Sequence, residues 1–112
     1  MALTNPDYSN LDYDDMAKNI GLKPKHIPLL LSSYLEEAQP LFASLETAIA
    51  KNDYETIKKN AHSLKGSSGN MRFTELYDMA KEMELSAAES NSSFEYAKYL
   101  EAISIAVATI KI

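Results

Sequence analysis

Apolar residues recur along this chain at every third or fourth position, a spacing that places them on one face of an α-helix. The alternation of apolar and polar residues that is typical of half-buried strands does not occur. The first helical stretch is short, from Leu11 to Asn19, with Asn10 as the expected N-cap and Gly21 just past its end. The residues before it, 1–10, are expected to form an N-terminal arm.

A long second helix is predicted to start near Pro24. Its apolar positions alternate steps of three and four: Ile27, Leu31, Tyr34, Ala38, Leu41, Leu45 and Ala48. Pro40 lies inside this pattern and cannot donate a backbone hydrogen bond. We therefore expect a kink or a break near Glu37.

Three more helices follow, and short connections between helices favour antiparallel neighbours. Asp53 is the expected N-cap of the third helix, the fourth begins near Thr74, and Ser92 or Ser93 caps the last. Their apolar faces are, in order, Ile57, Ala61, Leu64, Ser68 and Met71; Leu76, Ala80, Met83 and Ala87; and Phe94, Ala97, Leu100, Ser104, Val107 and Ile110. The pattern predicts an all-α protein, an antiparallel up-down four-helix bundle over residues 11–112 with a short extra N-terminal helix.

Composition narrows the classes of function. At 112 residues, with 46% hydrophobic and 24% charged residues, the chain resembles one soluble domain, and it has no cysteine for disulfides or thiolate metal sites. A net charge of −5 argues against a nucleic-acid partner. No apolar run approaches the roughly 18 residues of a membrane span, and residues 1–10 lack the pattern of a secretion signal. We expect a cytoplasmic protein, with no membrane partner and no need to be more than a monomer.

The predicted third helix carries the most unusual pattern of the chain, AHSLKGSSG over residues 61–69. On a helical wheel of about 100° per residue, the core positions of this helix fall within about 40° of Ile57. His62 lies at about 140°, Gly69 at about 120° and Gly66 at about 180°, so these three positions point away from the core. Two lysines flank the histidine on neighbouring turns: Lys58 and Lys65.

This arrangement has a chemical interpretation. An exposed imidazole is largely neutral at pH 7 and keeps a nucleophilic nitrogen. Nearby ammonium groups can offset the charge of a phosphoryl group on that nitrogen, and glycines let a partner come close. The chain carries no Walker loop, kinase glycine-rich loop or nucleotide-binding signature. A phosphoryl group accepted by His62 must therefore come from another protein.

These residues resemble a known signature, that of histidine-containing phosphotransfer (HPt) domains of two-component phosphorelays. The residues that carry the resemblance are His62, Leu64, Lys65, Gly66, Ser67 and Ser68, and it extends from about Leu11 to Ile112. It implies a four-helix bundle in which His62 is phosphorylated through Nε2, Lys65 neutralises the phosphoryl group and Gly66 leaves room for the partner.

The resemblance also implies the partner and the division of labour. The partner would be a response-regulator receiver domain or a hybrid histidine kinase. A receiver would supply the aspartate, the Mg²⁺ and most of the catalysis. This chain would then be a phosphocarrier rather than an enzyme, with no cofactor or metal of its own. The expected docking residues are Gly66, Gly69, Lys58, Lys59 and Arg72.

Two positions depart from the family pattern. Many members have a glycine ten residues after the histidine, where this chain has Arg72, and a long cation there would narrow or recharge the docking surface. Some members have a glutamine in the following helix, where this chain has Glu84. Its carboxylate could hold Lys65 or orient His62.

Alternatives stay open at this point. The glycines could allow close helix packing, and Lys58 and Lys59 could be an ordinary solvated face paired with Glu55. The bundle could also dock or sequester a receiver without transferring phosphate, although docking alone needs neither His62 nor Lys65. An enzyme, such as a kinase fragment or a metal-dependent hydrolase, is a third possibility. Two histidines without a dense carboxylate cluster argue against the metal site.

Overall fold

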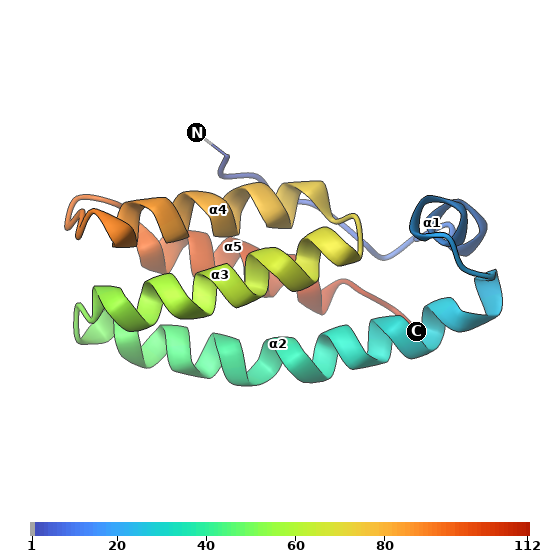
Figure 1. The fold of residues 1–112 in the computed structure, drawn as a ribbon, viewed down its shortest axis with the longest axis horizontal. Coiled ribbons are helices and arrows are strands. Elements are labelled where there is room, and N and C mark those ends of the chain that lie inside the picture. The colour runs from blue at the N-terminus through green and yellow to red at the C-terminus, as the bar shows by residue number, and fades with distance from the viewer. Residues whose placement is uncertain (1) are drawn as a thin grey trace.

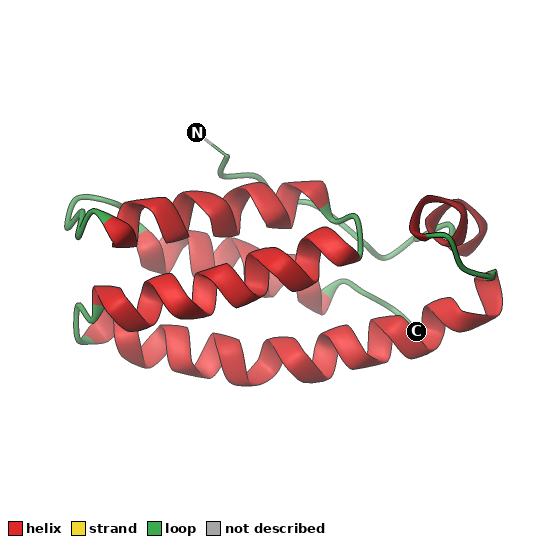
Figure 2. Ribbon diagram, viewed as in Figure 1, coloured by secondary structure: helices red, strands yellow, loops and turns green. Residues whose placement is uncertain are grey.

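Four long helices of residues 2–112, the part of the chain that the computed structural model describes, run alternately in opposite directions (Figure 1). They are α2 (Ile27–Ala50), α3 (Tyr54–Asn70), α4 (Thr74–Ala88) and α5 (Tyr96–Ala108). Each packs against two neighbours, in the order α2, α3, α4, α5 and back to α2. The predicted all-α, antiparallel four-helix bundle is confirmed, and Figure 2 shows helices and loops only over these residues.

The extra N-terminal helix, α1 (Tyr13–Ile20), lies beside the start of α2 (Figure 1). It begins two residues later than the sequence pattern predicts, because Asp12 rather than Asn10 caps it: the Asp12 side chain accepts a hydrogen bond from the Asp15 backbone N–H at 3.1 Å. It ends at Ile20, one residue later than predicted, and Gly21 follows it as expected, with φ +87°, a left-handed conformation that glycine tolerates well. The short 3₁₀ helix Pro24–His26 then leads into α2.

Of the predicted kink or break near Glu37, the break does not occur, because α2 continues through Pro40 as one 24-residue helix. Tyr34 and Ala38 before the proline, and Leu45 and Ala48 after it, are buried on the same side. Pro40 itself faces solvent, where water can satisfy the carbonyl that loses its partner. Packing on both sides of the proline therefore holds one continuous helix, which curves gently in Figure 1.

The last helix differs from the prediction in its start and in most of its buried face, of which only Val107 and Ile110 are buried as expected. α5 begins at Tyr96 after Glu95, and no side chain caps it, so neither Ser92 nor Ser93 does so. Its buried residues are Tyr96, Tyr99, Ala102, Ile103, Ala106 and Val107. The aromatic rings decide this: Phe94 packs 4.9 Å from Tyr96 and 4.5 Å from Tyr99 between ring centroids. Burying the aromatic rings of Tyr96 and Tyr99 removes more apolar surface from water than burying Ala97 would, and Ala97 is left exposed.

The N-terminal segment, residues 2–12, forms no helix but packs against the bundle. The ring of Tyr8 lies 4.5 Å from that of Phe73, centroid to centroid. The Tyr8 backbone N–H donates a hydrogen bond to Thr109 Oγ1 at 2.8 Å, beyond the end of α5. The N-terminal segment therefore does not extend freely into solvent, because Tyr8 contacts Phe73, just before α4, and Thr109, just after α5.

No helix within residues 2–112 is long and apolar enough to cross a membrane.

One buried polar pair joins α2 to α3 beneath the surface of the bundle. The Tyr34 hydroxyl and Ser68 Oγ are 2.8 Å apart, and both residues are buried. Burial raises the pKa of Tyr34 to about 12, so the phenol stays neutral over the physiological range. Ser68, which the sequence pattern places on the core stripe of α3, is thus a satisfied core residue.

We expect Ser68→Ala to lower the free energy of unfolding by about 1–3 kcal/mol, because it leaves the buried Tyr34 hydroxyl without a partner. Tyr34→Phe should cost less, since the remaining Ser68 hydroxyl can bond a carbonyl one turn back in its own helix. Denaturant unfolding of the two variants and of the double variant measures the coupling. Strictly additive losses would contradict a pairwise hydrogen bond.

Candidate functional site

His62 lies on the solvent side of α3, with 67% of its side chain exposed. The core stripe of the same helix is buried as predicted: Ile57, Ala61, Leu64, Ser68 and Met71. Asp53 caps the start of α3, accepting a hydrogen bond from the Thr56 backbone N–H at 3.2 Å. The helical pitch and this cap fix the direction of the imidazole, so the prediction that it points away from the core is confirmed.

Glu84 of α4 bridges the histidine and the lysine of α3. His62 Nδ1 lies 2.6 Å from Glu84 Oε2, and Lys65 Nζ donates to Glu84 Oε1 at 2.7 Å. Glu84 and Lys65 are much less exposed than the imidazole, at 17% and 21% of their side chains. One carboxylate therefore holds both groups, where the sequence had suggested either contact.

The carboxylate determines which ring nitrogen carries the hydrogen. Partial burial raises the pKa of Glu84, but hydrogen bonds from Lys65 and His62 outweigh it and lower the pKa from its ordinary 4.5. The ionised carboxylate can only accept hydrogen bonds, so the nitrogen facing it, Nδ1, is the donor. In the neutral imidazole this leaves Nε2 unprotonated, with its lone pair free.

The lysines around His62 differ in their settings. The hydrogen bond to Glu84 raises the pKa of Lys65, which is charged at neutral pH. Lys58 and Lys59 pair with Glu55 of their own helix at 3.3 and 3.9 Å, which is the solvated-face arrangement that the sequence left open. Both also line a shallow hollow beside the imidazole, together with His62, Ser63 and Glu84.

The two glycines near the histidine have different surroundings. A Cβ atom built on Gly66 would meet nothing within 4 Å, so packing inside the molecule does not require glycine there. A Cβ on Gly69 would lie 3.1 Å from Cδ2 of Tyr77 in α4, which gives Gly69 a packing reason within the bundle. The sequence did not identify Tyr77. The short turn between α3 and α4 could have indicated this contact, because it brings the end of α3 beside the start of α4.

Arg72 lies past the end of α3, about 15 Å along the helix axis from His62 at 1.5 Å per residue. Its backbone has φ +63°, in the left-handed region. Its guanidinium donates to the Gly69 carbonyl at 3.3 Å. The backbone conformation gives a physical reason why glycine suits this position.

We expect Arg72→Gly to raise the free energy of unfolding by roughly 0.5–1 kcal/mol, because glycine removes the left-handed strain but also gains freedom in the unfolded chain. Arg72→Ala is the matched control: it removes the same side-chain contact but keeps the strain. Thermal unfolding of both variants tests this. Equal stabilisation by alanine would show that the arginine side chain, not the backbone, is the source.

The second histidine of the chain lies away from this site. His26 is exposed at the end of the 3₁₀ helix Pro24–His26. Within residues 2–112, no three His, Asp or Glu side chains gather in a way that could hold a metal ion.

Comparison with known proteins gives one family. The model of the Hpt domain matches residues 29–109, which span all four bundle helices except the first residues of α2. Neither the curated proteins nor the solved structures contain a match to the chain.

Proposed function

The chain belongs to the Hpt domain family, a histidine phosphotransfer module of phosphorelays, and from this premise we propose that His62 is its phosphoacceptor. We propose that Nε2 accepts a phosphoryl group from a receiver-domain aspartate and passes it to another receiver. The observation that carries the proposal is the imidazole, 67% exposed, whose Nδ1 is held by Glu84, which leaves Nε2 unprotonated.

The transfer step follows from this geometry. The Nε2 lone pair attacks the phosphorus of the aspartyl phosphate, a P–N bond forms, and the bond from phosphorus to the carboxyl oxygen breaks. The aspartate leaves as a carboxylate. The Nδ1 proton stays on the ring, which becomes a phosphoimidazolium, and the Glu84 carboxylate facing that proton stabilises the positive charge. The reverse sequence delivers the group to a second aspartate.

Lys65 and Gly66 have distinct proposed roles. Lys65 supplies a positive charge one turn from His62 and can turn from Glu84 toward the phosphoryl oxygens. Gly66 has open space above it, which leaves room for a partner loop. The receiver would bring the aspartate and its Mg²⁺, and this chain would serve as a monomeric, cytoplasmic phosphocarrier without a metal of its own.

A docking module that binds a receiver without transfer is the second candidate function. The position of Lys58 and Lys59 is compatible with it, since both line the hollow beside the imidazole. The shared Glu84 contact favours transfer, because docking does not require a fixed imidazole tautomer.

The direct test is phosphorylation of the unaltered chain by phosphoramidate, followed by intact mass and peptide mapping. We expect one phosphoryl group, labile in acid, on the peptide that contains His62 and not on the one that contains His26. The second histidine is an internal control, because it is also exposed but has no Glu84 equivalent in contact. A group on His26, or on a serine and stable in acid, would contradict the proposal.

A further inference from the structure

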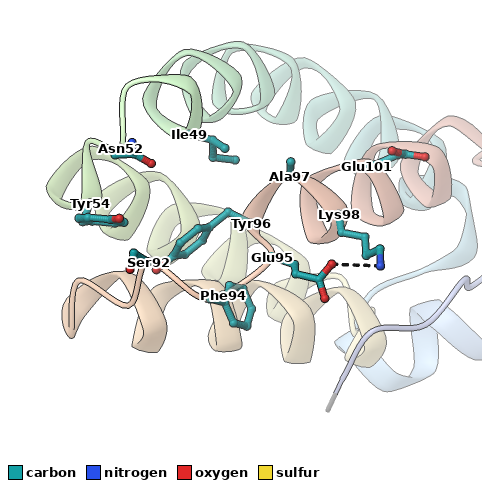
Figure 3. A pocket seen from close by; sticks show the side chains of 10 residues that line it. All are labelled: Ile49, Asn52, Tyr54, Ser92, Phe94, Glu95, Tyr96, Ala97, Lys98 and Glu101. Carbon is teal, nitrogen blue, oxygen red and sulfur yellow. Dashed lines mark ion pairs between the residues drawn. The ribbon is translucent and has the colours of Figure 1, made fainter.

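A groove that the phosphotransfer chemistry does not use runs between the second half of α2 and the first half of α5. Two adjoining hollows, both open to solvent, form it and share Ile49, Ala97 and Glu101. Figure 3 shows Ile49, Tyr96 and Ala97 among the side chains that line the first hollow. The second hollow continues along α5 past Leu100.

The floor of this α2–α5 groove is apolar and shallow. Ile49 and Leu100 are half-buried, and the methyl groups of Ala50 and Ala97 are exposed. Small side chains allow another helix to approach to the usual interaxial distance of about 8–10 Å. From Ala97 to Ser104 the groove follows α5 for about 10 Å, or roughly two helical turns. The sequence pattern had predicted this part of α5 to be buried, but Ala97 is exposed and Leu100 is only half-buried.

The rim of the groove is acidic. Glu46 of α2 and Glu101 of α5 lie along it. Glu95 stands at the end near Phe94, and the one lysine of the rim, Lys98, is already paired with Glu95 at 3.0 Å. Figure 3 marks this pair with a dashed line. An occupant with positive charge on both sides of an apolar strip would complement the groove.

The described ends of this chain are engaged elsewhere. Tyr8 of the N-terminal segment packs on Phe73. Near the C-terminus, the Lys111 carbonyl accepts a hydrogen bond from the Tyr13 hydroxyl at 3.3 Å. A second copy of the chain in the groove would bring two acidic rims together, which disfavours a symmetric dimer. The charge therefore favours a different protein.

The groove and the phosphoacceptor lie on opposite sides of the bundle. His62 and Lys65 contact Glu84 across the α3–α4 side. Because the helices pack in the cyclic order α2, α3, α4, α5, the α2–α5 side is the one farthest from it. A partner in the groove would leave the imidazole accessible to a receiver.

We propose that the α2–α5 groove docks an amphipathic helix of a partner protein, about two to three turns long, with apolar residues on one face and Lys or Arg beside them. The contact is small, so the interaction is weak and reversible. It would tether the module to another protein while His62 remains free to exchange phosphate. The proposal does not depend on the chemistry at His62.

The test is a titration of the ¹⁵N-labelled chain with a synthetic helical peptide that carries leucine at steps of three and four and lysine elsewhere. The control peptide has glutamate in place of lysine. We expect amide shifts at Ile49, Ala50, Ala97 and Leu100 with the basic peptide only, and unchanged amides at His62 and Lys65. Shifts centred on α3 and α4, or no binding, would overturn the proposal.

Variants of the chain distinguish binding of the peptide in the groove from general attraction of a basic peptide to an acidic protein. The double variant Glu46→Lys and Glu101→Lys should weaken binding by about tenfold, and Ala97→Gln should weaken it by filling the floor. Ala88→Gln, at an exposed alanine that ends α4, is the matched control and should bind as the unaltered chain does. Equal affinity of all variants for the basic peptide would overturn the proposal. A dimer of the unaltered chain in sedimentation that is lost in the Glu46→Lys and Glu101→Lys double variant would overturn it as well.

Discussion

His62→Gln is expected to abolish formation of the acid-labile phosphoryl adduct, with phosphoramidate and with a phosphorylated receiver alike. Glutamine has no ring nitrogen to attack phosphorus, so the loss should be complete rather than partial. The fold should be unaffected, because the imidazole is mostly exposed and contributes nothing to the buried stripe of α3. Intact mass after incubation with donor measures the adduct, and circular dichroism checks the helices.

His26→Gln is the matched control for this experiment. It changes the other histidine of the chain, at an exposed position before α2, and should accept phosphate at the rate of the unaltered protein. If the His62 variant keeps an acid-labile adduct, the phosphoacceptor proposal fails. If neither the unaltered chain nor the variants form one with any phosphorylated receiver, the docking function becomes the better account.

Glu84→Ala is expected to slow phosphoryl acceptance by about 10- to 100-fold. A hydrogen bond to a charged group contributes about 1.5–3 kcal/mol, and losing such a contribution in the transition state corresponds to this change in rate. The variant removes the acceptor that faces Nδ1 and that would stabilise the proposed phosphoimidazolium. Initial rates with phosphoramidate measure the effect without any contribution from receiver docking.

The variant Glu84→Gln distinguishes the effect of the hydrogen-bond acceptor at position 84 from the effect of its negative charge. Its amide oxygen can still accept from Nδ1–H, but it offers Lys65 no anion, so the rate should fall between those of the alanine variant and the unaltered chain. The ¹⁵N shifts of the His62 ring supply a readout that a merely structural residue would not move. We expect Nδ1–H in the unaltered chain and loss of that preference in Glu84→Ala. Unchanged rates and ring shifts would remove Glu84 from the mechanism.

The pH dependence of stability gives an independent check on the same carboxylate. The pKa of Glu84 in the folded state is lowered, so its ion pairing stabilises the fold above the ordinary carboxyl pKa of 4.5. This contribution is lost as the pH falls through the folded-state pKa. The difference in unfolding free energy between the unaltered chain and Glu84→Gln should therefore shrink as the pH falls below 4.5.

The spacing of apolar residues correctly predicted features that depend on one helix alone. The buried stripes of α2, α3 and α4 and the outward direction of His62 all depend on helical pitch alone, which relates residues of one helix by a fixed rotation. Asp53 and Gly21 act locally at helix ends and were also predictable. Where two faces of one helix were both apolar, as in α5, spacing could not choose between them.

Contacts between helices needed the tertiary structure. The shared contact of Glu84 with His62 and Lys65 depends on the register of α4 against α3, which the turn and the packing set. The same register packs the ring of Tyr77 beside Gly69 and leaves the space above Gly66 unoccupied. The continuity of α2 through Pro40 depends likewise on packing to either side of it.

The sequence by itself determined an all-α bundle with an exposed histidine beside a lysine and a glycine, because these features follow from composition and the pitch of one helix. Only the tertiary structure decided which nitrogen of that histidine is free, which glycine leaves open space, and which face of α5 remains uncovered. The physical reason is the same in each case. Helical pitch fixes directions within an element, whereas partners across elements are selected by burial and hydrogen bonding once the helices are packed together.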